Sequence, residues 1–211
     1  MKLSHLGSIA IVICIACNAA SAQTYDLQKL LKEKKLVTAG KKVVPLTEPG
    51  KSGVSMTGIS WIEGLDFSTG TIDIDLRGKD VVQKSFIGIA FHGVDTITHD
   101  VVYFRPFNFR SPDPVRKIHA VQYVSHPEFT WDRLREERNG VFEKGIDPPP
   151  LATDWFHAKI EVTTSEVIVY VNGSSTPSLR VKKLNERVNG KIGLWNEALD
   201  GDFANLTITK R

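Results

Sequence analysis

The chain has 211 residues and a formal net charge of +3, with 41% hydrophobic and 24% charged residues. These values are typical of an ordinary folded domain, and they exclude disordered, collagen-like and coiled-coil classes. The net charge is too small to indicate a nucleic-acid-binding protein, because phosphate binding requires a concentrated basic surface.

Residues 1–22 have the pattern of a secretory signal peptide. Lys2 precedes an apolar stretch from Leu6 to Ala16, and Ala20-Ser21-Ala22 forms an A-x-A cleavage site. We therefore expect cleavage after Ala22 and a secreted or periplasmic mature protein. Both cysteines, Cys14 and Cys17, fall within this segment, so the mature chain would have no disulfide and would be held by its core. An alternative is lipid attachment at Cys17, and only this alternative implies membrane anchoring.

The remaining chain changes early from a helical pattern to a strand pattern. Thr24 to Leu36 is predicted to be a helix capped by Thr24, because its leucines repeat at helical spacing. Residues 23–42 are thus an N-terminal helix and linker, and residues 43–211 are predicted to form an all-β, antiparallel two-sheet sandwich. Its predicted strands are Val43–Leu46, Gly58–Ile62, Thr71–Leu76, Ser85–Phe91, Val101–Arg105, Ala120–Val124, Trp155–Val162, Val167–Val171, Lys191–Trp195 and Phe203–Thr209. The uncharged Ser85–Phe91 strand is expected to lie inside a sheet.

A thirty-residue insertion, 125–154, interrupts the strand pattern. It contains Phe129, Trp131 and Phe142, which are apolar anchors that a disordered linker would lack, and it ends in a run of three prolines. We predict an ordered lid with one helical turn.

Several sequence strings resemble the concanavalin A-like lectin/glucanase superfamily. They are Gly70–Leu76, the hairpin from Trp155 to Gly173, and the ending formed by Gly190–Trp195 and Asp200–Leu206. The ending is similar to those of laminin-G-like domains and of exported bacterial 3-keto-disaccharide hydrolase-like domains. The resemblance implies a jelly roll with a concave sheet, but not one activity, since this superfamily contains lectins, hydrolases and adhesion modules.

The glucanase motif E-x-D-x-(x)-E is absent. The nearest string is Asp73-Ile74-Asp75, whose two carboxylates share one strand face about 6.6 Å apart along the backbone. That spacing falls in the range of inverting glycosidases, roughly 6.5–9.5 Å. Aspartates near turns on a sandwich strand are most often solvated residues of the outer face, and we favour this interpretation of the string.

The predicted ligand site lies where aromatic residues and histidines concentrate, between residues 86 and 131. If Val102 and Phe104 face the core, alternation places Tyr103 and Arg105 on the other face. His92 would share that face with the small residues Gly88 and Ala90. Aromatic rings stack on sugars while polar groups bind hydroxyls. The candidate ligand-binding residues are therefore His92, Tyr103, Arg105, Asn108, Arg110, His119, Gln122 and Trp131. His119 and Gln122 have opposite parity, so a regular strand cannot send both to one cleft.

The leading hypothesis is an exported carbohydrate-binding module that holds a glycan or small sugar on its concave sheet. A glycoside or 3-keto-glycoside hydrolase or lyase is the alternative, with His92, His119 or Glu128 as general acid or base. An interaction module for another exported protein is the third. The aromatic residues could also be core, with Arg105 and Arg110 paired to Glu136 or Glu137. No cofactor and no histidine metal site are expected, although Asp200 and Asp202 could bind calcium. The glycan, the linkage, the catalytic residues and the oligomeric state stay open.

Overall fold

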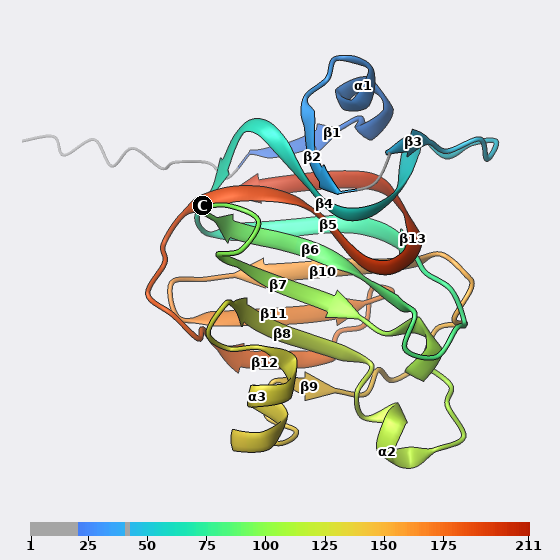
Figure 1. Ribbon diagram of the computed structural model, residues 1–211, viewed down its shortest axis with the longest axis vertical. Helices are drawn as coiled ribbons and strands as arrows, with labels where there is room; N and C mark the ends of the chain where they lie inside the picture. The colour runs from blue at the N-terminus through green and yellow to red at the C-terminus, as the bar shows by residue number, and fades with distance from the viewer. Residues whose placement is uncertain (1–20, 41–42) are drawn as a thin grey trace, which may run out of the picture.

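The computed structural model describes residues 21–40 and 43–211, which form two layers of antiparallel strands (Figure 1). The predicted signal peptide, with both cysteines, lies outside the described residues up to residue 20. Two long strands, β4 (Gly53–Phe67) and β13 (Gly190–Lys210), run through both layers and connect them into one hydrogen-bonded set. Among the described residues, no helix has the length and apolar character needed to cross a membrane.

One layer, which we call the pocket sheet, faces the viewer in Figure 1. It consists, in order, of β2 (Leu36–Gly40), the second half of β4, the first half of β13, β6 (Ser85–Gly93), β7 (His99–Phe104), β8 (Val121–His126) and β9 (Glu143–Lys144). The uncharged strand β6 lies between β13 and β7. Its predicted interior position is therefore confirmed.

The other layer, the back sheet, lies behind the pocket sheet in Figure 1. Its strands are β3 (Val44–Pro45), the first half of β4, β1 (Ala22–Tyr25), the second half of β13, β5 (Gly70–Arg77), β10 (Phe156–Val162), β11 (Glu166–Val171) and β12 (Leu179–Lys182). The predicted all-β antiparallel sandwich of two sheets is confirmed.

The hydrophobic core fills the space between the two sheets. Phe104 of β7 meets Phe156 of β10, with ring centroids 5.0 Å apart, and both side chains are almost completely buried. Val102 also points inward, as alternation along β7 requires. Tyr103 is consequently on the outward face of the pocket sheet, which is where the sequence predicts it.

The N-terminal prediction is wrong in part. Thr24 belongs to β1, and α1 (Leu27–Lys32) is capped by Asp26, whose Oδ1 accepts hydrogen bonds from the backbone N–H groups of Gln28 and Lys29. The extended residues up to Tyr25 pair with β13, so the tertiary contact decides against helix there.

Two further differences concern strand limits and the insertion. The predicted strands at 191–195 and 203–209 are one strand, β13, which has a register shift between Asn196 and Gly201. The insertion contains the helix α3 (Trp131–Glu137), followed by β9, and its role as a lid stays a prediction. Between β7 and β8 lie the 3-10 turn η1 (Pro106–Asn108) and the short helix α2 (Pro114–Lys117).

Candidate functional site

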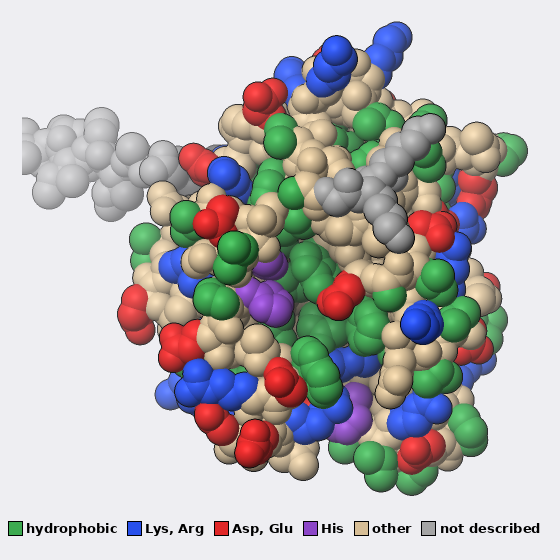
Figure 2. Space-filling view, viewed as in Figure 1, with side chains coloured by type: hydrophobic (Ala, Val, Ile, Leu, Met, Phe, Trp, Pro, Cys, Tyr) green, Lys and Arg blue, Asp and Glu red, His purple; other side chains and the backbone are tan. Residues whose placement is uncertain are grey.

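A pocket of about 500 Å³ opens on the outward face of the pocket sheet. Figure 2 shows this face, with hydrophobic side chains at its centre and histidines on either side of them. The pocket volume lies in the range that holds small ligands. Its aromatic lining comes from β6, β7, η1, α3 and β13 and consists of Phe86, Tyr103, Phe107, Trp131 and Trp195.

A glycine allows two of these rings to meet. Gly88 of β6 is paired with Tyr103 of β7 on one side and with Trp195 of β13 on the other. Because Gly88 has no side chain, the two rings approach above it, with centroids 5.2 Å apart and planes tilted by 44°. The space that the small residue leaves is thus occupied by aromatic surface.

A polar network that is almost fully buried begins at the hydroxyl group of Tyr103. The Tyr103 hydroxyl donates to Gln122 Oε1 over 2.7 Å, and Arg105 Nη2 donates to the Tyr103 hydroxyl over 2.6 Å. Arg105 Nη2 also donates to Gln122 Oε1. Burial raises the pKa of Tyr103 to about 12, so its hydroxyl stays protonated at neutral pH.

Glu143 of β9 joins this network to α3. It is 2% exposed, and its carboxylate accepts from Arg135 Nε over 2.9 Å and from Arg135 Nη2 over 2.7 Å. Arg105 Nη1 lies 3.4 Å from the same carboxylate. Burial by itself raises the pKa of Glu143, but the hydrogen bond and charge of Arg135, with Arg105 and His119, hold that pKa below its ordinary value. Glu143 is therefore ionised at neutral pH.

His119 lies at the edge of the pocket and precedes β8, which begins at Val121. This placement removes the parity conflict with Gln122, because His119 is not part of the strand. The His119 Nδ1 atom lies 2.8 Å from Glu143 Oε2, in an arrangement that does not have hydrogen-bond geometry. Burial lowers the pKa of His119, and the charge of Glu143 opposes that shift.

Three more of the predicted residues take part in the pocket wall. Asn108 lines the pocket, and its Nδ2 donates to the His119 carbonyl over 3.0 Å, whereas its buried Oδ1 has no partner among the described residues. Trp131 is 49% exposed and its ring packs against the Arg135 guanidinium at 5.2 Å. Gln122 does not line the pocket, but it takes part in the wall because its Oε1 accepts hydrogen bonds from Tyr103 and Arg105.

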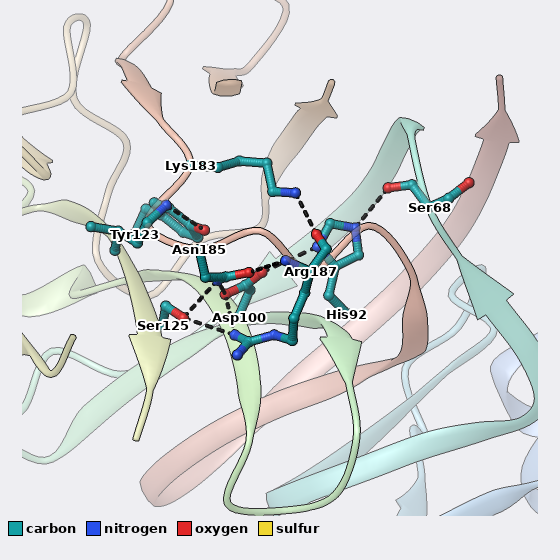
Figure 3. A network of polar contacts seen from close by, with 9 residues as sticks. Ser68, His92, Asp100, Tyr123, Ser125, Lys183, Asn185 and Arg187 are labelled. Carbon is teal, nitrogen blue, oxygen red and sulfur yellow. Dashed lines mark hydrogen bonds and ion pairs between the residues drawn. The ribbon is translucent and has the colours of Figure 1, made fainter. Parts of the chain in front are cut away.

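His92 is not at the floor of the pocket. Its backbone has φ of +49°, within the irregular pairing of β6 with β13, and the ring therefore turns into the core, where it is 0% exposed. Its Nδ1 lies 3.1 Å from Asp100 Oδ2 and its Nε2 lies 2.7 Å from the Ser68 carbonyl (Figure 3). Asp100 also accepts a 2.7 Å hydrogen bond from Arg187, so this network connects the interior to the loop after β12.

Arg110 also lies apart from the pocket. Its Nε and Nη2 atoms both donate to the Pro149 carbonyl, over 3.1 and 3.0 Å, and so fix the proline-rich end of the insertion. Neither Arg105 nor Arg110 pairs with Glu136 or Glu137, because the partner of Arg105 is Glu143. The alternative general acid Glu128 is exposed and lies 3.7 Å from Arg133.

The remaining acidic candidates are ion-paired on other surfaces. Asp73 and Asp75 are on the back sheet, where both contact His157, at 3.2 and 3.0 Å. Asp200 pairs with Lys79 and Asp202 with Arg77, at 2.8 and 2.9 Å. Within residues 21–40 and 43–211, no group of three or more histidine, cysteine or acidic side chains is arranged to hold a metal ion.

The structure adds pocket residues that the sequence reasoning did not select. They include Phe86, Arg116, His126, Arg135, Trp195 and, behind the wall, Glu143. Trp195 carried a usable signal, because alternation in Gly190–Trp195 places its ring on the face opposite Leu194. Glu143 carried none, since β9 is too short to show a period.

No family model matches the chain, and no curated protein matches it. Among solved structures, the carbohydrate-binding module CBM66 from Bacillus subtilis is 15% identical, with a TM-score of 0.56, and the match covers 90% of this chain and 97% of that one. A Bacillus subtilis protein of unknown function with a galectin-like fold is 14% identical, with a TM-score of 0.53, over 82% of this chain and 89% of that one. The chain therefore shares the fold of these two proteins, which agrees with the jelly roll that the sequence resemblance implied.

Proposed function

We propose that this chain is an exported carbohydrate-binding protein and that it holds a glycan in the pocket of the pocket sheet. Export rests on the predicted signal peptide, and sugar binding rests on the chemistry of the pocket. The proposal agrees with the fold shared with CBM66, whose name identifies it as a carbohydrate-binding module. A shared fold does not establish a shared function, so the residues of the pocket have to support the proposal.

The observation that carries the proposal is the aromatic surface over Gly88. Tyr103, which is 4% exposed, and the partly exposed Trp195 line the apolar floor of the pocket, and Trp131 lines the same pocket with half of its surface exposed. Sugar rings stack on such surfaces through their C–H faces, while their hydroxyls need hydrogen-bonding groups at the edge. Asn108 lines the pocket, and its buried Oδ1, which has no partner among the described residues, could accept such a bond after a small movement of the side chain.

The experiment is a glycan array followed by calorimetric titration of the best ligand. Trp131→Ala should weaken binding at least tenfold and leave the melting temperature nearly unchanged, because the side chain is largely exposed. Trp155→Ala is the matched control, since Trp155 is outside the pocket and packs between Lys51 and Arg77. If no glycan binds, or if Trp131→Ala binds as the unchanged protein does, the proposal is wrong.

A hydrolase or lyase is the second candidate, because one titratable side chain of the pocket has the arrangement of a general base. His119 lines the pocket, its Nδ1 faces the ionised Glu143, and burial lowers its pKa. Incubation of each bound glycan with the protein, followed by mass spectrometry, separates the two functions. Binding alone leaves the glycan intact, whereas the enzyme would yield products that disappear with His119→Gln.

A further inference from the structure

The pocket has more cationic side chains than carboxylates that could neutralise them. Three arginines, Arg105, Arg116 and Arg135, line the pocket, and Glu197 is the carboxylate that lines it among the described residues. Glu143 lies behind the wall, where its oxygens face Arg105 and Arg135. Since Glu143 is 2% exposed, a ligand in the pocket cannot reach it.

Arg105 and Arg135 are already engaged, but Arg116 is not. Arg116 belongs to α2, and it forms no ion pair with any residue that the structure describes. Its Nη2 atom is buried and lacks a hydrogen-bond partner in the same residues. The guanidinium lies 6.0 Å from the centre of the Phe107 ring, which removes water from one side of it.

A buried guanidinium N–H group without an acceptor is unfavourable unless a bound group supplies one. The planar fork of an arginine suits a carboxylate or a sulfate, which can accept two parallel hydrogen bonds. Because Arg116 lines the same pocket as Trp131 and Asn108, such an anion would be part of the molecule that occupies the pocket.

We infer that the pocket selects a glycan with an acidic group, a carboxylate or a sulfate on the sugar ring, and that Arg116 binds this group. The inference rests on the proposed carbohydrate-binding function and specifies its ligand. Arg135 adds positive charge at the pocket wall, where it is one third exposed. The apolar floor then holds the ring, and the guanidinium of Arg116 fixes its orientation.

The test compares three probes in calorimetric titrations: uronic acid oligosaccharides, the same oligosaccharides with their carboxyl groups reduced to alcohols, and sulfated oligosaccharides of equal length. At least one acidic probe should bind ten times more tightly than the reduced probe, and this preference should weaken at high salt. The preferred acidic probe identifies the carboxylate or the sulfate as the group that Arg116 binds.

Arg116→Gln should remove the preference, so that the acidic and the reduced probes bind with equal affinity to this variant. Lys117→Gln is the matched control, because Lys117 follows Arg116 in α2, loses the same charge and does not line the pocket. Equal binding of all three probes, or an unchanged preference in Arg116→Gln, would overturn the inference while the carbohydrate-binding function stands. Binding of no probe, together with an empty glycan array, would overturn both.

Discussion

Replacing Glu143 tests whether the buried network fixes the pocket wall. Glu143→Ala removes the carboxylate that pairs with Arg135 through two hydrogen bonds and that neutralises the buried Arg105. Breaking a buried ion pair by removing one partner costs about 3–5 kcal/mol. Arg135 is one third exposed, so solvent screens its share, and we expect a loss of about 3 kcal/mol of unfolding free energy. A domain with a stability of about 5–15 kcal/mol stays folded after this loss.

The assay is urea unfolding at pH 7, followed by tryptophan fluorescence. Glu143→Gln keeps an acceptor oxygen and should lose roughly 1–2 kcal/mol. Glu137→Ala is the control, because Glu137 belongs to the same insertion but pairs with Arg133 at the surface, and its unfolding midpoint should not change measurably. Glycan binding should weaken in Glu143→Ala alone, because Arg135 then no longer holds α3 and Trp131 in place.

The pH dependence of the unfolding free energy tests whether the ionised Glu143 carboxylate is the source of this stability. The folded-state pKa of Glu143 is lowered from 4.5, so the stability it contributes is fully present above that pH and is lost as the pH falls through the folded-state pKa. The difference between Glu143→Gln and the unchanged protein should therefore decrease below pH 4.5. Two results would contradict this reasoning. One is a difference in unfolding free energy between Glu143→Gln and the unchanged protein that stays constant down to pH 3. The other is a loss of less than about 1 kcal/mol of unfolding free energy in Glu143→Ala, because the ion pairs of Glu143 would then not stabilise the pocket wall.

Two further predictions concern the pocket sheet. Burial, assisted by the charge of His126, lowers the pKa of His99 from 6.5 to about 4, so stability is complete above pH 6.5 and falls by at most about 3 kcal/mol as the pH decreases to 4. In His99→Phe, the unfolding free energy should depend less on pH between pH 6.5 and 4, as measured by urea titrations at each pH. If the slope of unfolding free energy against pH is unchanged, other groups cause the dependence. Gly88→Ala would place its new methyl group 2.0 Å from the Val102 carbonyl oxygen, so the strands must separate, at a cost of about 1–3 kcal/mol. Thermal melting checks this, and an unchanged midpoint would mean that β6 and β7 can move apart freely.

Regular alternation made much of the pocket sheet predictable from the sequence. Along β7, the inward Val102 and Phe104 fix the outward Tyr103, and the pairing with β8 confirms that order. The same rule fails at His92, because one residue with positive φ reverses the direction of its side chain. Nothing in the residue types around His92 signals this reversal, since histidine is not a residue that requires the left-handed region.

The long strand β13 and the helix α1 show two other limits. The Asp-Gly pair at residues 200–201 indicates a turn, yet it marks a bulge at which β13 passes from one sheet to the other. The end of the predicted helix at Thr24 was wrong because β1 gains partners from β13, nearly 200 positions away. Glu143 shows that a functional wall can depend on a residue with no local pattern at all.

The pocket consists of two layers that have different consequences for function. In the inner layer, both terminal nitrogens of Arg105 are bonded to protein groups, so Arg105 positions the wall and is not free to bind ligand. In the outer layer, Asn108 and Arg116 each have a polar atom without a partner in the part of the chain that the structure describes, and Trp131 has exposed ring surface. Changes in the inner layer must therefore lower stability before they alter binding. Changes in the outer layer must alter the choice of ligand while the fold is retained. Comparing the two kinds of variant therefore distinguishes a ligand-binding pocket from a polar surface depression that binds nothing.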